Sequence, residues 1–274
     1  MATSEVLTLA RHGHVATLWL DNPDRGNAMG PAFWADLPRC MAEVGDDDDV
    51  RAVVVAARGA HFSVGLDLKS AAVLVDGEGG GATSGAARAA RTYREVRRLQ
   101  ASINAVAECP KPVVAAIQGY CIGGGVDLAC ACDIRLAASG AVFSVRETRM
   151  AIVADLGSLQ RLPRVIPQGH AAELAYTGRD IDAERARAIG LVNDVLADHD
   201  AVVAAAGDLA GEIASNSPLA VQGTKAVLAA SQDRTVAEGL DFVAAWNAGF
   251  LASEDLAEAM AAFREKRPPD FRGR

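Results

Sequence analysis

Short apolar runs alternate with segments of helical periodicity along the first two-thirds of the chain. Residues 6–10 and 14–20 are β-type runs on either side of Arg11-His12-Gly13, and this pattern predicts a hairpin. Four later runs are expected to form strands: 52–57, 113–118, 133–138 and 142–145. The first of these is apolar throughout, which is typical of a strand buried on both faces of a sheet.

Helical patterns occupy much of the remaining chain. A helix is predicted over 31–44, because Pro31 is tolerated in a first turn, and the low-complexity stretch 77–85 is predicted to be a loop. From Ser158 onward the pattern is helical. Breaks in it are expected at Pro163, Pro167, Gly178, Gly190 and Pro218. Strands that alternate with helices, followed by a helical tail, predict an α/β protein whose tail packs on the core.

The composition is that of an ordinary soluble globular protein. Half of the 274 residues are hydrophobic, 23% are charged, and the formal net charge is -8. We expect no binding of nucleic acid or of an anionic membrane through bulk charge, because the chain is acidic. No apolar run reaches the roughly 18 residues that a membrane-spanning helix needs.

The ends of the chain, its composition and its cysteines predict a cytoplasmic bacterial protein. No signal peptide is visible, and residues 271–274 are not a peroxisomal tripeptide. The sequence is rich in alanine and has more arginine than lysine, as in proteins of GC-rich bacterial genomes. The 5 cysteines include no CxxC pair, so we expect reduced thiols rather than a disulfide framework or a zinc site.

A glycine run at 123–125 follows the strand expected at 113–118. It allows a ligand to approach the backbone closely, and a helix that begins there would direct free N–H groups towards that ligand. A phosphate loop would need Gly-Lys-Ser/Thr where Val126-Asp127 stands, and the glycines supply no dinucleotide fingerprint in register. A tight turn with close packing is the alternative interpretation of this run.

A second loop, 61–68, follows the buried strand at 52–57. Gly65 allows an unusual backbone angle that would turn the N–H of Leu66 outward, although a plain turn is the simpler interpretation. The loops that follow two parallel strands lie side by side at the strand ends. Two N–H groups that converge there would form an oxyanion hole.

Three carboxylates stand near these loops in the sequence: Asp127, Glu147 and Asp155. Taken singly, Asp127 suits the first turn of a helix, Glu147 could pair with a neighbouring arginine, and Asp155 could cap the next helix. Asp155 follows the apolar run 151–154, so a buried position is expected for it. Carboxylates gathered in a poorly solvated pocket repel one another, which raises their pKa values and lets them carry protons near neutral pH.

Three stretches together resemble the crotonase superfamily, also called the enoyl-CoA hydratase/isomerase family. They are residues 61–68, 117–133 and 143–163, and the likeness extends over nearly the whole chain. It implies an α/β fold with a crotonase-like β/α spiral core, expected over residues 1–200. It also implies a C-terminal helical region over 201–274 for trimerisation and pocket closure. The expected assembly is a homotrimer or homohexamer.

Within this family, the runs 121–128 and 154–163 most resemble the Δ3,5-Δ2,4-dienoyl-CoA isomerases. That branch has Asp, Glu and Asp at the places of Asp127, Glu147 and Asp155, whereas enoyl-CoA hydratases have Glu at the first and typically Gly at the third. The resemblance implies conversion of 3,5-dienoyl-CoA to 2,4-dienoyl-CoA in fatty acid β-oxidation, with no cofactor or metal. The alternatives are an enoyl-CoA hydratase or other crotonase-type enzyme, and a non-catalytic acyl-CoA-binding protein.

The resemblance also implies roles for single residues. The N–H groups of Leu66 and Gly124 would hold the thioester oxygen. Substrate contacts are expected at Arg25, Ala28, Val64, Gly65, Asp67 and Leu68, with Arg25 near the CoA phosphates. Glu147 would take a proton from C2 of the substrate and Asp155 would supply one to C6. Asp127 would hydrogen-bond to Glu147 and tune it.

Overall fold

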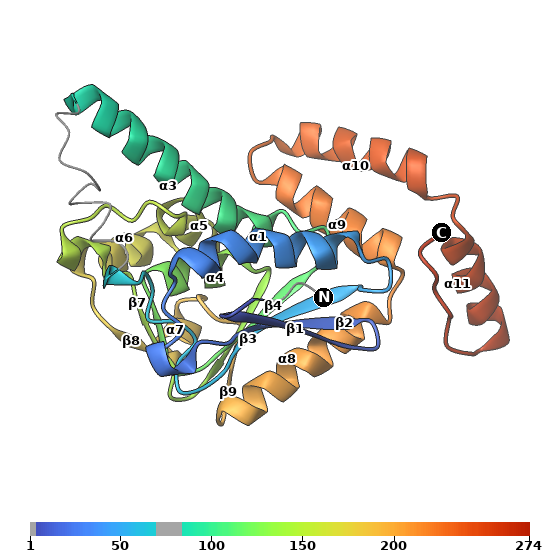
Figure 1. Ribbon diagram of the computed structural model, residues 1–274. Helices are drawn as coiled ribbons and strands as arrows, with labels where there is room; N and C mark the ends of the chain where they lie inside the picture. The colour runs from blue at the N-terminus through green and yellow to red at the C-terminus, as the bar shows by residue number, and fades with distance from the viewer. Residues whose placement is uncertain (1–3, 70–83) are drawn as a thin grey trace.

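A 6-stranded sheet of order β1-β2-β3-β4-β6-β9 forms the centre of the computed structural model, which describes residues 4–69 and 84–274 (Figure 1). Its strands are β1 (Leu7–His12), β2 (Val15–Leu20), β3 (Ala52–Ala57), β4 (Val113–Ile117), β6 (Ile134–Ala138) and β9 (Asp194–Leu196). β1 and β2 pair antiparallel, which confirms the predicted hairpin, and all other neighbours are parallel. β9 was not predicted from the sequence.

A second, 3-stranded sheet has the order β5-β7-β8. Its strands are β5 (Tyr120–Ile122), β7 (Val142–Ser144) and β8 (Ile181–Asp182). β5 lies directly before the glycine run, and Gly123 N–H donates to the carbonyl of Ser144 at the end of β7 (2.9 Å). The small sheet therefore fixes where the glycine run begins its helix.

Helices cover both faces of the large sheet. The described helices are α1 (Pro31–Asp46), α3 (Gly85–Ala107), α4 (Gly124–Ala131), α5 (Ser158–Val165), α6 (Gln168–Thr177), α7 (Ala183–Ala188), α8 (His199–Ala214), α9 (Pro218–Ser231), α10 (Val236–Phe250) and α11 (Glu254–Glu265), with 3-10 turns η1 (Pro23–Arg25) and η2 (Glu147–Met150). Val54 of β3 packs towards α8, whereas Val53 and Val55 join the core with α1, α3 and α4. The strand is buried on both faces, as its apolar pattern predicts.

One predicted helix break is wrong. α5 continues through Pro163 to Val165. A proline removes only its own N–H from the helical ladder, and the adjacent Leu162 is anchored in the core at 1% exposure, so packing outweighs the lost bond. The other predicted breaks, Pro167, Gly178, Gly190 and Pro218, lie at or next to helix ends. In the predicted loop at 77–85, residues 77–83 lie outside the described residues, and Gly85 begins α3.

The C-terminal helices α9, α10 and α11 lie to one side of the sheet (Figure 1). Asp255 of α11 accepts hydrogen bonds from the N–H of Arg272 (2.7 Å) and from the hydroxyl of Ser217 (2.7 Å). Arg51, next to β3, donates to the carbonyl of Phe271 (2.8 Å). The bond from Arg51 ties the end of the chain to the core. The boundary expected at residue 200, between the spiral core and the C-terminal helical region, stays a prediction.

The five cysteines, Cys40, Cys109, Cys121, Cys130 and Cys132, are free and buried. Burial raises the pKa of Cys130 and of Cys132 to about 12. Within residues 4–69 and 84–274, no group of three or more His, Cys, Asp or Glu side chains is placed to hold a metal ion. Of the helices that the structure describes, none has the length and apolar character that crossing a bilayer requires.

Candidate active site

The loops that follow β3 and β4 meet at the ends of these parallel strands. Ser63 N–H donates to the carbonyl of Tyr120 (2.9 Å), and Ile122 N–H donates to the carbonyl of Ser63 (3.0 Å). The loop after β2 joins them through Met29, whose N–H donates to the carbonyl of Gly65 (2.8 Å). Three segments far apart in the sequence are thus hydrogen-bonded into one surface, as expected at the strand ends of an α/β sheet.

Leu66 and Gly124 lie side by side on this surface. Gly65 has φ +85°, the unusual angle that the sequence suggested. A Cβ atom placed on Gly65 would lie 3.3 Å from the nitrogen of Gly124, and one placed on Gly124 would lie 3.8 Å from the nitrogen of Leu66. Within the described residues, neither N–H donates a hydrogen bond to the protein. Two free N–H groups this close are the arrangement that an oxyanion requires.

Glu147 lies directly against the start of α4. A Cβ atom placed on Gly123 would be 3.3 Å from Glu147 Oε1, and Oε2 is buried without a hydrogen-bond partner among the described residues. Burial, assisted by the charges of Asp127 and Asp155, raises the pKa of Glu147 to about 7. The neighbouring Arg146 does not neutralise it, because that guanidinium pairs with Asp180 (2.7 Å). Glu147 can therefore gain or lose a proton near neutral pH.

Asp127 lies in the first turn of α4 and is 1% exposed. Its Oδ1 accepts two hydrogen bonds from Ser158, from the backbone N–H (2.5 Å) and from the hydroxyl. Burial raises the pKa of Asp127 to about 6, and the bonds from Ser158 oppose this rise. The predicted hydrogen bond between Asp127 and Glu147 does not form among the described residues, because the Asp127 carboxylate accepts from Ser158 instead. Asp127 acts on Glu147 through its charge.

Asp155 is exposed in the single chain, contrary to the expectation of a buried position. The apolar run before it turns at Ala151, which has φ +57°, and Val153 in that run is 74% exposed. Partial burial still raises the pKa of the Asp155 carboxyl. Asp155 does not cap α5 either, since the cap position is Gly157 and the first helical N–H is bound by Asp127.

Of the residues expected to contact substrate, two bind each other and three others lie at the surface or are half-buried. Arg25 donates to Asp67 (3.0 Å), and this ion pair buries Asp67 while leaving the Arg25 side chain 50% exposed. The Asp67 carboxylate thus holds Arg25 in place. Val64 and Leu68 are exposed at the rim, and Ala28 is half-buried next to Met29.

Three polar residues that shape the site were not singled out from the sequence. Asn27 has φ +55° and donates to the carbonyl of His61 (2.7 Å). Ser63 donates to the carbonyl of Asn27 (2.8 Å) and accepts from the N–H of Gly65 (3.1 Å). Asn27 follows a glycine in a dense loop, a local signal for the left-handed conformation. The third residue, Ser158, carries no such signal, because its partner stands 31 positions away.

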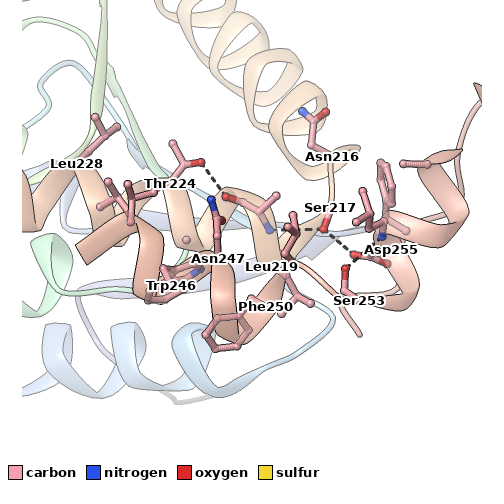
Figure 2. A pocket seen from close by; sticks show the side chains of 18 residues that line it. Asn216, Ser217, Leu219, Thr224, Leu228, Trp246, Asn247, Phe250, Ser253 and Asp255 are labelled. Carbon is pink, nitrogen blue, oxygen red and sulfur yellow. Dashed lines mark hydrogen bonds between the residues drawn. The ribbon is translucent and has the colours of Figure 1, made fainter. Parts of the chain in front are cut away.

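A cavity of about 580 Å³ lies elsewhere, among α9, α10 and α11 (Figure 2). Its lining is mainly apolar and includes Leu219, Leu228, Trp246 and Phe250. None of the site residues expected from the sequence lines it. The cavity is therefore a feature of the C-terminal helices and not of the carboxylate site.

Comparisons with known proteins find similarity over nearly the whole chain. A family model described as enoyl-CoA hydratase/isomerase matches residues 10–274. The chain is 43% identical over 258 residues to a mitochondrial Δ(3,5)-Δ(2,4)-dienoyl-CoA isomerase of Dictyostelium discoideum, covering 94% of this chain and 87% of the relative. It is 39% identical over 269 residues to the peroxisomal isomerase of Arabidopsis thaliana, covering 98% of this chain and 96% of the relative.

Solved structures show the same architecture. An enoyl-CoA hydratase from Bacillus anthracis superposes with a TM-score of 0.89 at 30% identity, covering 98% of this chain and 100% of that one. An enoyl-CoA hydratase from Mycobacterium tuberculosis gives a TM-score of 0.84 at 29% identity, covering 98% and 99%. The fold class predicted from the sequence is confirmed.

The predicted cytoplasmic bacterial location is corrected by these comparisons. Relatives at 39–43% identity are named as mitochondrial or peroxisomal proteins. Free thiols and an acidic composition suit any reducing compartment, so neither feature could distinguish among them.

Proposed function

Because the chain belongs to the enoyl-CoA hydratase/isomerase family, we propose that it is a Δ3,5-Δ2,4-dienoyl-CoA isomerase. The observation that carries the proposal is the position of Glu147 against Gly123, one residue before the free N–H of Gly124. A thioester oxygen held by Leu66 and Gly124 would bring the adjoining C2 carbon to this carboxyl. A proton carrier next to an oxyanion hole is what enolate chemistry requires.

The reaction moves one proton and gains or loses no atoms. Removal of a C2 proton from the 3,5-dienoyl thioester leaves a dienolate whose charge spreads from the thioester oxygen to C6. Protonation at C6 then gives the 2,4-dienoyl product. Each N–H of the hole contributes about 3–4 kcal/mol to stabilising this charge, by analogy with other oxyanion holes.

The carboxylates divide the proton transfers between them. Glu147 takes the C2 proton, and Asp155, at the exposed end of the site, supplies the C6 proton. Two groups are needed because the two carbons lie at opposite ends of an extended diene. Asp127 contributes a negative charge that favours the protonated form of Glu147. No metal or redox cofactor takes part in this scheme.

The CoA part binds at the rim formed by Val64, Leu68 and Arg25. The chain carries a net charge of -8, so attraction for the CoA phosphates must be local. Arg25 is the basic group available in this loop, and its salt bridge with Asp67 fixes its direction. Ala28 and Gly65 contribute backbone surface next to the thioester.

The assembly is a homotrimer or homohexamer formed through the helices after residue 200. α10 buries none of its residues within the single chain, and its Val236 and Leu240 are 81% and 62% exposed. Contiguous exposed apolar surface is typical of subunit interfaces. The cavity of Figure 2 is lined by other residues of α10, among them Trp246 and Phe250, which supports a role for the region in assembly and pocket closure.

A parallel absorbance assay tests the function. Purified protein is given 3,5-octadienoyl-CoA in one cuvette and crotonyl-CoA in another. The isomerase raises near-ultraviolet absorbance in the first and leaves the enoyl band of the second intact. Loss of the enoyl band alone would assign the protein to the hydratases, and binding without turnover of either would make it a non-catalytic acyl-CoA-binding protein.

A further inference from the structure

Ser158 and Asp127 form a buried contact between two helices. Ser158 is the first residue of α5 and is completely buried, and both its N–H (2.5 Å) and its hydroxyl reach Oδ1 of Asp127 in α4. Bonds to a carboxylate oxygen favour the ionised form of the acid. Two donors on one oxygen also fix the rotation of the carboxylate.

The turn before α5 strengthens this arrangement. Gly157 has φ +127°, and a Cβ atom there would lie 2.0 Å from the guanidinium of Arg161. The missing side chain lets Arg161 fold back over the helix start, where it bonds to Asn104 (2.5 Å). From this position its positive charge also favours the ionised form of Asp127.

We propose that Ser158 is a positioning residue of the isomerase, which holds Asp127 as an oriented carboxylate so that its charge keeps Glu147 able to carry a proton. This inference rests on the proposed function. The new element is that Ser158, which is not one of the three carboxylates, sets how readily Glu147 carries a proton. Ser158 touches no substrate atom in this scheme and acts through Asp127.

Among the described residues, few other charged groups act on the pKa values of Asp127 and Glu147. The charged groups that act on the pKa of Asp127 are Arg161 and Asp155, and those that act on Glu147 are Asp127 and Asp155. The thiols of Cys121 and Cys130 also lie close enough to feel the charge of Asp127. The thiols stay neutral, since burial raises the pKa of each. Loss of the Ser158 hydroxyl should therefore move the titrations of Asp127 and Glu147 in opposite directions, because the two carboxylates are coupled.

Carbon-13 NMR of the carboxyl groups tests the inference without substrate. We expect Ser158→Ala to raise the titration midpoint of Asp127 by about 1 and to lower that of Glu147, since one of two bonds to the charged form is lost. Ser158→Thr keeps the hydroxyl and should restore both midpoints. Ser102→Ala is the matched control, because Ser102 is an equally buried serine whose hydroxyl binds the carbonyl of Trp34 (2.6 Å). Unchanged midpoints in folded Ser158→Ala would overturn the proposal.

Kinetics supply the second readout. Ser158→Ala should lower kcat roughly 10-fold with little change in KM and shift the pH profile towards lower pH, as expected for a lost bond to a charged group. If Ser158→Ala does not fold, Ser158→Cys, which keeps the volume but is a weaker donor, takes its place. Absence of isomerase activity in the unaltered protein would refute the proposed function, whereas the NMR titrations would still decide whether Ser158 controls the two carboxylates.

Discussion

The carbonyl oxygen of Ile122 occupies the place where a side chain on Gly65 would begin, because a Cβ atom at Gly65 would lie only 2.7 Å from it. This contact joins the loop after β3 to the strand that leads into α4. The backbone nitrogens of Leu66 and Gly124 lie near one another because the backbones approach this closely. The absence of one methyl group thus sets the geometry of the candidate oxyanion hole.

Gly65→Ala should disable this hole. The substitution adds a backbone clash at a residue with φ +85°, so the N–H of Leu66 must move. We expect kcat to fall roughly 10²–10³-fold, the usual effect of losing one such donor. Gly140→Ala is the matched control, since a Cβ atom there meets nothing within 4 Å. Equal kcat values for the two variants in the dienoyl-CoA assay would argue against the hole.

Asp155→Asn should abolish proton delivery while leaving binding intact. An amide cannot supply the C6 proton, so we expect roughly 10²–10⁴-fold lower isomerase activity. Affinity for an unreactive acyl-CoA, measured by calorimetry, should stay within about 3-fold, because the N–H donors and Arg25 are untouched. Full activity of this variant would remove Asp155 from the mechanism. Asp208→Asn, on the exposed face of α8, serves as the control.

Glu147→Gln should stabilise the fold at alkaline pH. The pKa of Glu147 is raised from 4.5 to about 7 in the native state, so folding retains a proton that the unfolded chain releases. Native stability therefore falls as pH rises from 4.5 to about 7, and the penalty is complete above that value. We expect the variant to gain on the order of 2 kcal/mol at about pH 8 and little at about pH 4.5. Urea unfolding at the two pH values measures this, and an equal gain at both would contradict the assigned burial.

Arg25→Gln should weaken binding without slowing the chemistry. The guanidinium is half-exposed and held by Asp67 at 3.0 Å, in the loop proposed to contact the CoA phosphates. We expect KM to rise roughly 5–10-fold with kcat unchanged, and the difference from the unaltered protein to shrink at high salt. Arg88→Gln, an exposed arginine on α3, provides the comparison. A fall in kcat with unchanged KM would place Arg25 in the chemistry instead.

Leu240→Glu should break the assembly. Leu240 is 62% exposed on α10, a helix that buries nothing in the single chain. A charge placed at a packed subunit interface carries a large desolvation cost. Size-exclusion chromatography with light scattering should show a smaller particle, whereas Ala188→Glu on α7 should leave the mass unchanged. A monomeric unaltered protein would overturn the proposed trimer.

Local sequence patterns could predict most of the fold. The strand at 52–57 is marked by its continuous apolar run, and Gly178 and Pro218 mark helix ends through backbone constraints that are local. β5, of only three residues within a glycine-rich stretch, was missed because its pairing with β7 is a tertiary contact. Pro163 was misjudged for the same reason, since packing of Leu162 overrides local propensity.

The candidate site was predicted only in part. The loops that carry Leu66 and Gly124 could be paired because each follows a parallel strand, and strand ends converge by topology. The choice of Gly124 within the glycine run came from the family resemblance. The exposure of Asp155 could not be predicted from the sequence, because it depends on the turn at Ala151 and on how the other elements of the same chain pack around that turn. Ser158 was assigned no role, since a buried serine acquires one only from the partner that folding places beside it.

The buried cysteines have a practical consequence for experiments on this protein. Burial raises the pKa of every one of the five thiols, so the native protein presents no reactive thiolate to a maleimide. A single exposed cysteine, introduced for example as Ala188→Cys, would react far ahead of the native thiols. Fluorophores or spin labels can thus be attached at chosen positions without first replacing the natural cysteines, and distances between labelled positions can be measured on the otherwise unaltered protein.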